Sequence, residues 1–208
     1  MTKAEELSVL RRYQHIWLGL LFLAITPLSI IPGLPFFSEN PQNWWNSVSQ
    51  TYYSNTSMVM IYSFTLIGII SLVYRAKNIA ERIVMILMGI SSILVVAFPH
   101  ALNEETRTGF FHVSGALSCK VHFVAAGICF FAILARSFLF IPAKAGFENS
   151  HQKNVFYIVS TFFIFLGCFL VIFARMNVIP GFFVLVSEFI MFSLYGIEFL
   201  ISTDKIKE

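Results

Sequence analysis

One acidic residue lies deep in a long apolar stretch near the end of the sequence. Glu188 follows the start of the stretch 178–201 by about ten residues. A helix rises about 1.5 Å per residue, so this carboxyl lies roughly 15 Å deep, near the middle of a bilayer. An ionised carboxylate at that depth is costly unless it is paired or protonated. We interpret Glu188 either as a proton carrier, ligand anchor or general acid/base, or as a protonated group that hydrogen-bonds a neighbouring helix.

Three of the five histidines, His100, His112 and His122, flank two other apolar stretches. Three imidazoles and a water form a catalytic zinc arrangement, which makes these residues candidate metal ligands. The sequence contains no His-x-x-x-His or His-Glu-x-x-His spacing. On one continuous helix, His112 and His122 would lie about 15 Å apart, too far for one ion. The alternative is that these histidines make hydrogen bonds near the membrane interface. The sequence identifies no cofactor.

Hydroxyl and aromatic side chains gather before the second apolar stretch. Ser49, Tyr52 and Tyr53 could form a rim that hydrogen-bonds a ligand arriving from outside. The other interpretation is an anchor at the interface, where Trp and Tyr are enriched. Because Trp44 and Trp45 precede the group, we favour the anchor and expect the segment to lie on the membrane surface.

The composition defines the setting of these residues. Of 208 residues, 57% are hydrophobic and only 12% are charged, whereas soluble domains average about 25% charged residues. A soluble fold of this size could not bury so much apolar side chain. The net charge of +3 is small and suggests no nucleic-acid partner. The chain is therefore expected to be a multi-pass membrane protein whose main partner is the lipid bilayer.

Apolar stretches long enough to cross a bilayer divide the chain. A spanning helix needs roughly 20 apolar residues. We predict an all-α bundle of six transmembrane helices, forming one integral membrane domain over residues 1–208. Pro180 is expected in the first turn of the last helix, and Gly89 and Gly127 are expected at close helix contacts. The predicted spans are about 16–31, 58–74, 83–98, 121–141, 155–173 and 178–201.

Basic residues orient the six spans, because Lys and Arg concentrate in cytoplasmic loops. Eleven of the 14 would share one side with both termini, and three would lie on the other. We therefore predict cytoplasmic termini. The eleven are Lys3, Arg11, Arg12, Arg75, Lys77, Arg82, Arg136, Lys144, Lys153, Lys205 and Lys207, and the three are Arg107, Lys120 and Arg175.

Other polar residues in or near the apolar stretches have simpler interpretations. Arg136 lies near the inner end of its span, where a long side chain can extend to the interface. Glu198 is closer to the inner interface than Glu188, and His15 is expected at the inner surface. Glu188 is thus the one charged residue that we expect to be clearly intramembrane.

Several motifs resemble an uncharacterised bacterial family of integral membrane proteins. They are Ser47-x-Ser49-x-x-Tyr52-Tyr53, His122-Phe-Val-Ala-Ala and the late Glu188, within residues 44–201. The resemblance implies a functional polar set and location in a bacterial inner membrane. The chain has Ser54-Asn55-Thr56 where that family often has an acid, and Phe98-Pro99-His100 where it tends to have Phe-Pro-Thr. The implied set is Ser49, Tyr52, Tyr53, His122 and Glu188.

The chain is also distantly similar to the membrane hydrolase superfamily of alkaline ceramidases and adiponectin-type receptors. That group uses Ser, Asp and three His around zinc, and Ser49 and His122 match two of these types. The only Asp in the chain is Asp204, at its tail, and the paired His of a late helix is missing. These departures argue against transferring the hydrolase activity.

Three functional hypotheses follow, and the sequence leaves open whether the protein is an enzyme. The first is a membrane protein that binds or senses an apolar or amphipathic ligand, such as a lipid, from the outer side. The second is a metal-dependent lipid hydrolase that uses the outer histidines. The third is a small proton-coupled transporter in which Glu188 carries the proton.

Overall fold

The protein is an all-α membrane bundle. The computed structural model describes residues 3–31, 46–101, 105–140 and 151–202. Five of the helices are long and apolar enough to cross a membrane, whereas α3 is apolar but has only 16 residues. The helices are α1 (Lys3–Ile30), α3 (Ser57–Leu72), α4 (Ile79–Ala97), α5 (Gly115–Phe140), α6 (His151–Arg175) and α7 (Phe182–Ser202).

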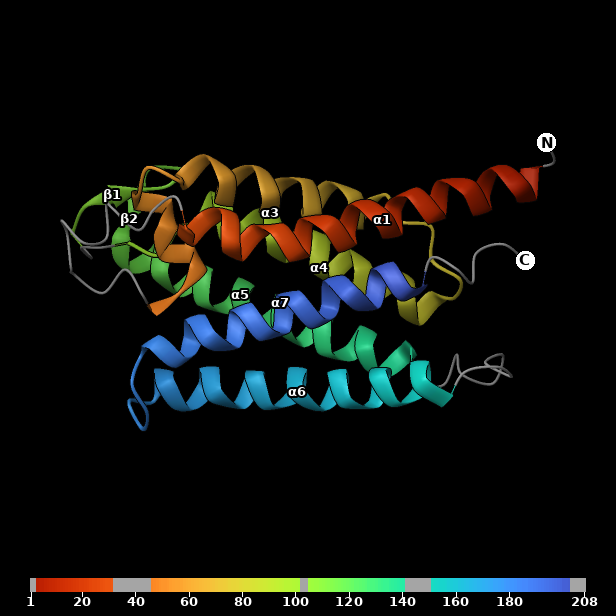
Figure 1. Cartoon of the computed structure of the whole chain (residues 1–208). Coiled ribbons are helices and arrows are strands. Elements are labelled where there is room, and N and C mark those ends of the chain that lie inside the picture. Colours follow the sequence, from red (N-terminus) through yellow and green to blue (C-terminus); the bar gives the residue numbers. More distant parts are fainter. Residues whose placement is uncertain (1–2, 32–45, 102–104, 141–150, 203–208) are drawn as a thin grey trace.

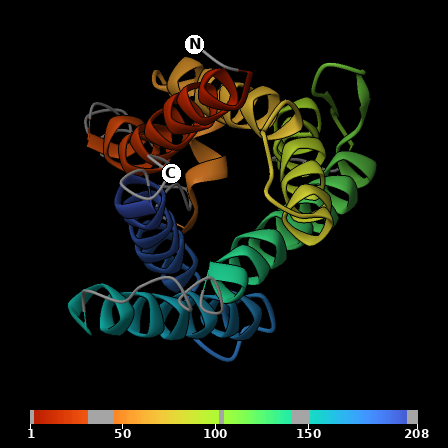
Figure 2. The ribbon, with the colours of Figure 1, turned by 90° about the vertical axis from the view of Figure 1, so that its right-hand side faces the viewer.

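The helices follow one another around a ring, and α7 closes the ring by packing against α1 (Figure 2). At the end of the bundle where α1 begins and α7 ends, the last turn of α7 contacts the middle of α1, with His15 Nδ1 2.6 Å from Ser202 Oγ. We call this the terminal end of the bundle. Helix α3 runs antiparallel to α1 (Figure 1). Its two ends contact α1 through Gln14, which donates to Val73 O, and through Thr56, which donates to Ser29 O.

The opposite end, which we call the hairpin end, carries shorter elements (Figure 1). A 3-10 helix, η3 (Val48–Tyr53), precedes α3. Strands β1 (Arg107–Thr108) and β2 (Val113–Ser114) form an antiparallel hairpin between α4 and α5. The hairpin, which the sequence did not predict, requires a positive φ at Gly109 and at His112.

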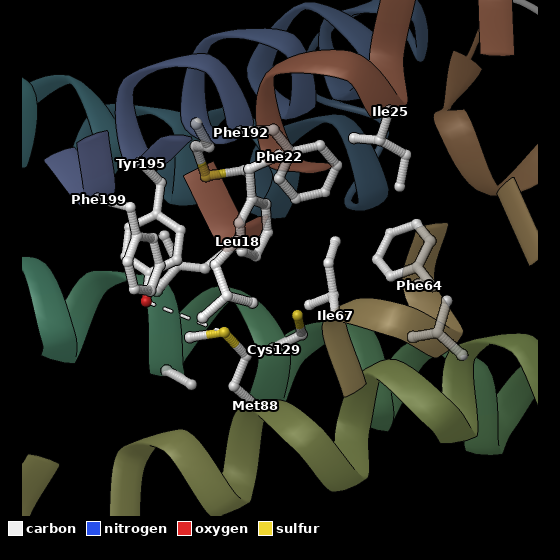
Figure 3. Packing of buried hydrophobic residues seen from close by; sticks show 14 of the residues in the cluster. Leu18, Phe22, Ile25, Phe64, Ile67, Met88, Cys129, Phe192, Tyr195 and Phe199 are labelled. Carbon is white, nitrogen blue, oxygen red and sulfur yellow. Dashed lines mark hydrogen bonds between the residues drawn. The ribbon is translucent and has the colours of Figure 1, made fainter. Parts of the chain in front are cut away.

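Large apolar side chains from the six long helices form the core, and Figure 3 shows part of this packing in the interior of the ring. Helix α7 supplies Phe192 and Tyr195, which both pack against Phe22 of α1. The ring of Phe192 is tilted relative to that of Phe22, and the ring of Tyr195 contacts it edge to face. Other large apolar side chains face outward along the helices, as Phe131 and Phe162 do with about 60% of their surface exposed. A soluble protein rarely leaves so many apolar side chains in contact with water, so this outer surface suits lipid.

Glycines allow two pairs of helices to approach closely. A Cβ on Gly196 of α7 would lie 2.8 Å from the carbonyl oxygen of Gly19 in α1. A Cβ on Gly89 of α4 would lie 2.9 Å from the carbonyl oxygen of Gly68 in α3. The expectation for Gly89 is confirmed. The expectation for Gly127 is wrong, because a Cβ there would meet nothing within 4 Å.

Several helix boundaries differ from the predicted spans. Helix α1 begins at Lys3, well before position 16, because polar residues continue the helix beyond its apolar part. Helix α5 begins at Gly115, so His112 lies before it and not on the same helix as His122. Helix α7 begins at Phe182, so Pro180 precedes the helix and does not occupy its first turn.

Candidate functional site

A small internal cavity lies beneath η3 at the hairpin end. Three polar side chains from separate elements reach it: Ser49 of η3, His122 of α5 and Glu188 of α7. Its volume of about 20 Å³ is enough for a single water molecule. The structure thus brings together three of the five residues proposed from the sequence. The remaining lining is apolar or weakly polar and consists of Phe64, Val95, Ala126, Cys129, Phe130 and Phe192.

Glu188 connects α7 to η3. Its Oε2 accepts a hydrogen bond from the backbone N–H of Val48 at 2.6 Å, and the residue is only 6% exposed. Because α7 begins at Phe182, Glu188 lies six residues into the helix, roughly 9 Å from its start. It is therefore closer to the hairpin end than the predicted 15 Å, which is why it can reach η3. Its second oxygen makes no hydrogen bond to the described residues.

His122 is held by the end of α4. Its Nδ1 lies 2.9 Å from the carbonyl oxygen of Phe98 and 3.2 Å from that of Val95. Carbonyl oxygens only accept hydrogen bonds, so Nδ1 carries the proton and Nε2 of the neutral ring is an acceptor. Nε2 makes no hydrogen bond to the described residues. It remains available to a molecule in the cavity.

Half of the residues of η3 are buried against the bundle. Val48, Ser49 and Thr51 are each less than 9% exposed, whereas Gln50, Tyr52 and Tyr53 are half-buried, and the anchor at the membrane interface stays a prediction. Local hydroxyls satisfy the backbone there, since Thr51 Oγ1 donates to Val48 O and Ser54 Oγ donates to Thr51 O. The carbonyl oxygens of Val48 and Thr51 therefore have hydrogen-bond partners although the two residues are buried. Trp44 and Trp45 lie outside the described residues.

Tyr52 and Tyr53 do not line the cavity. Their rings contact each other edge to face at 5.1 Å, and Tyr53 OH lies 3.0 Å from Thr108 Oγ1 of β1. Burial raises the pKa of Tyr53, so its hydroxyl stays protonated. Tyr53 therefore joins η3 to the hairpin, and neither residue of this pair lines the cavity.

The three candidate zinc ligands do not form one site. The rings of His100 and His122 are neighbours, with centroids 6.1 Å apart, but His112 is exposed in the hairpin. Within the described part of the chain, no group of three His, Cys, Asp or Glu side chains is arranged to hold a metal ion. The histidine triplet proposed from the sequence is thus not assembled.

Ser49, His122 and Glu188 also do not form a hydrogen-bonded catalytic triad. Ser49 Oγ lies 2.9 Å from Ser47 Oγ, while His122 is engaged with backbone carbonyls. A nucleophilic serine normally hydrogen-bonds its base. What the arrangement offers is a hydroxyl and two acceptors around a space with apolar walls, which suits a small polar group attached to an apolar body.

A second polar cluster lies at the terminal end and was not predicted from the sequence. We call Arg11, His15, Tyr74, Glu81 and Arg136 the terminal cluster. Glu81 is at its centre and accepts from Arg11 at 2.9 Å and from Tyr74 OH at 3.0 Å. His15 lies 2.5 Å from the same tyrosine hydroxyl. Burial raises the pKa of Tyr74, so the hydroxyl remains a donor to the carboxylate.

Arg136 does not extend to the interface as predicted. Its side chain is 1% exposed, lies 3.9 Å from Glu81 and stacks on the ring of Phe199 at 3.6 Å. Likewise His15 is 2% exposed, although it was expected at the surface. The useful signal was an arginine within an apolar stretch, because such residues usually face the bundle interior and pair there.

Glu198 is also fully buried and links three helices. Its carboxyl accepts from Ser137 of α5 at 2.7 Å and from Ser160 of α6. Both hydrogen bonds end within the bundle, and the residue does not line the cavity beneath η3. We had expected Glu188 to be the one charged residue clearly inside the helical bundle. That expectation is wrong, because Glu198 is buried there as well.

The cavity and the terminal cluster are separated by apolar packing. On α4, Met88 lies midway between Glu81 and Val95; on α7, Phe192 lies between Glu188 and Tyr195. These side chains pack in the centre of the ring (Figure 3). A proton route from Glu188 to the terminal cluster would have to cross this layer.

No protein-family model, curated protein or solved structure matches this chain.

Proposed function

We propose that this integral membrane protein binds an amphipathic ligand at the hairpin end, with the ligand's polar group in the cavity beneath η3. The observation that carries the proposal is the convergence of Ser49, His122 and Glu188 on one space. These three residues come from segments far apart in the sequence. Each supplies a hydrogen-bonding atom to an otherwise apolar cavity.

The size of the cavity requires η3 to move before a lipid-sized molecule binds. A volume of about 20 Å³ holds one water, whereas small-molecule pockets measure about 300–1,000 Å³. The hydrogen bond from Val48 to Glu188 is the contact that a ligand hydroxyl would replace. The apolar chain would then lie among Phe64, Phe130 and Phe192. Ligand binding would thereby change the position of η3, which is how occupancy could be sensed.

The proposed orientation places the hairpin end outside and both termini in the cytoplasm of a bacterial cell. The terminal end carries more cations than the hairpin end, as the positive-inside rule requires of a cytoplasmic side. A fluorescent protein fused to the carboxyl terminus should fluoresce inside the cell, and a periplasmic reporter at the same position should be inactive. The reverse pattern would reject this orientation. The described cations at the terminal end are Arg11, Arg12, Arg75, Lys77, Arg82 and Arg136.

The binding proposal is tested with monoolein, an uncharged lipid with two hydroxyls. We expect monoolein to raise the melting temperature of the purified protein in detergent, since a ligand that binds only the folded state stabilises it. The increase should be lost in Glu188→Gln and His122→Ala. Glu198→Gln is the matched control, because it alters a buried acid on the same helix away from the cavity. Equal increases in all variants would reject the site.

Ester hydrolysis is the second candidate function, because the cavity combines the residue types Ser, His and Glu. Incubation with monoolein distinguishes it from binding. Hydrolysis would add water across the ester and release oleate and glycerol, which mass spectrometry detects. Product formed by the wild type and abolished in Ser49→Ala would support an enzyme. Bound but unchanged monoolein would support binding alone.

A further inference from the structure

An open cavity of about 990 Å³ lies at the terminal end, between the start of α1 and the connection from α3 to α4. It is separate from the cavity beneath η3 and lies at the other end of the bundle. Four cationic side chains line it, Arg11, Arg75, Lys77 and Arg82, and no acidic side chain is among its described lining residues. So many like charges around one space favour an anion.

The walls of this cavity are held in place by hydrogen bonds. The connection 73–78 is tied to α1 by Gln14, whose Nε2 donates to Val73 O and whose Oε1 accepts from Arg75 N. Arg82 Nη1 donates to the carbonyl oxygen of Tyr74 at 2.7 Å. The backbone that presents the cations is therefore fixed before any ligand binds.

The nearby acid, Glu81, pairs with only one of these four cations, Arg11. Glu81 is buried behind the cavity and accepts from Arg11 and from the backbone N–H of Lys77. Arg75 and Lys77 are exposed, and neither side chain forms a salt bridge with the described acids. Burial, and secondarily the neighbouring charge of Arg11, lower the pKa of Lys77.

Apolar side chains complete the cavity. Leu7 of α1, Leu72 of α3 and Ile79 of α4 line it together with Val73. The cavity lies where α3 ends and α4 begins, which is the depth of the lipid headgroups for helices that cross a membrane. A soluble anion would make no favourable contacts with these apolar walls. A phospholipid presents a phosphate and acyl chains together, so it can contact both the cations and the apolar side chains.

We propose that this cavity binds the phosphate headgroup of an anionic phospholipid, with Arg75 and Lys77 as its free cations. The upper parts of the acyl chains contact Leu72 and Ile79. Basic pockets between membrane helices on the cytoplasmic side bind anionic headgroups in this way. The site goes beyond the proposed function and uses none of the residues of the cavity beneath η3.

The test uses short-chain phosphatidylglycerol as probe, with phosphatidylcholine and sodium phosphate for comparison. We expect phosphatidylglycerol to raise the melting temperature of the purified chain in detergent. In Arg75→Gln/Lys77→Gln, half-saturation should need at least about tenfold more lipid, given the contribution of each cation near an anionic lipid. The control Arg107→Gln/Lys120→Gln removes two exposed cations at the hairpin end and should bind as the wild type does.

Three results would each overturn a different part of the proposal. An equal response to phosphatidylcholine would show that the negative charge is not recognised. A full response to sodium phosphate alone would indicate a free-anion site and not a lipid site. Unchanged binding by Arg75→Gln/Lys77→Gln would move the site elsewhere. His122→Ala should keep the response to phosphatidylglycerol while it loses the response to monoolein, so the two proposals fail independently.

If the double variant does not fold, competition on the wild type decides. Native mass spectrometry of protein from micelles with equal phosphatidylglycerol and phosphatidylcholine should show the anionic lipid retained preferentially. The preference should fall in Lys77→Gln, which alters a single exposed side chain. Retention of the two lipids in equal amounts would reject the site.

Discussion

The backbone N–H of Val48 donates to the carboxylate of Glu188 at 2.6 Å, joining η3 to α7 across 140 positions of the sequence. Because both groups are buried, removing the acceptor leaves a buried N–H unsatisfied. Glu188→Leu should cost about 1–3 kcal/mol of unfolding free energy. Glu188→Gln keeps a carbonyl acceptor and should cost less. Amide hydrogen exchange at residues 48–53 should accelerate in Glu188→Leu.

Glu198→Leu is the control for this prediction. It removes a buried acid that accepts from Ser137 and Ser160 and makes no contact with η3. It should lower stability without a selective change in exchange at residues 48–53. Unchanged exchange of η3 in Glu188→Leu would show that the hydrogen bond does not hold this segment.

Neutralising the acid of the terminal cluster should strongly destabilise the fold. Glu81→Gln leaves the fully buried Arg136 and the adjacent Arg11 without their carboxylate. Breaking a buried ion pair on one side costs about 3–5 kcal/mol. Thermal or denaturant unfolding should show this loss, whereas Glu6→Gln at an exposed position of α1 should be nearly neutral.

The second arm of this experiment removes the buried cation as well. Glu81→Gln/Arg136→Met should be more stable than Glu81→Gln alone, because the uncompensated charge is gone. If the double variant loses as much unfolding free energy as the two single variants together, this account of the cluster is contradicted.

The contact between α1 and α7 should not tolerate a methyl group. In Gly196→Ala the new Cβ would approach Gly19 O to 2.8 Å, so the helices must separate. We expect a loss of about 1–3 kcal/mol. Gly127→Ala provides the matched control, because its Cβ meets nothing within 4 Å. It should be neutral or raise stability by up to about 1 kcal/mol, since Ala favours helix. Equal effects of both changes would contradict the packing argument.

Acidification should destabilise the hairpin end partly through His100. Burial, and secondarily the charge of Arg175, lower the pKa of His100 below its ordinary value of 6.5. The unfolded state then takes up a proton at a pH where the folded state does not. Stability is complete above pH 6.5 and falls as the pH decreases toward the folded pKa. Between pH 7 and 5, the melting temperature of His100→Gln should fall less than that of the wild type. An identical fall would show that His100 does not contribute to the acid destabilisation.

The sequence predicted much of the fold because hydrophobic length is a strong signal. All six apolar stretches became helices, although α3 has only 16 residues. Boundaries were less predictable: Pro180 precedes α7, and the polar start of α1 remains helical. These ends depend on which backbone groups find partners, and hydropathy does not report that.

The site was predictable in part. Glu188 was identified by residue type and depth, and Ser49 and His122 by residue type and by the family resemblance. The fold placed the three around one cavity. The terminal cluster was missed because Arg136 and Glu81 lie near helix ends, where charge is usually solvated. Only the packing of α1, α4 and α5 shows that these two side chains turn inward. Their pairing across 55 positions leaves no periodic pattern in the sequence.

The closed ring of helices has a consequence for how the chain is made. His15 pairs with Ser202, and the two residues are separated by 187 positions. At a synthesis rate of about 5–20 residues per second, α1 waits roughly 10–40 seconds for its last neighbour. During that interval its interior polar side chains, including Gln14 and His15, face the bilayer or the insertion machinery unpaired with α7. Biogenesis therefore has a vulnerable period that the finished protein does not reveal, and truncations that remove α7 should be cleared by quality-control proteases.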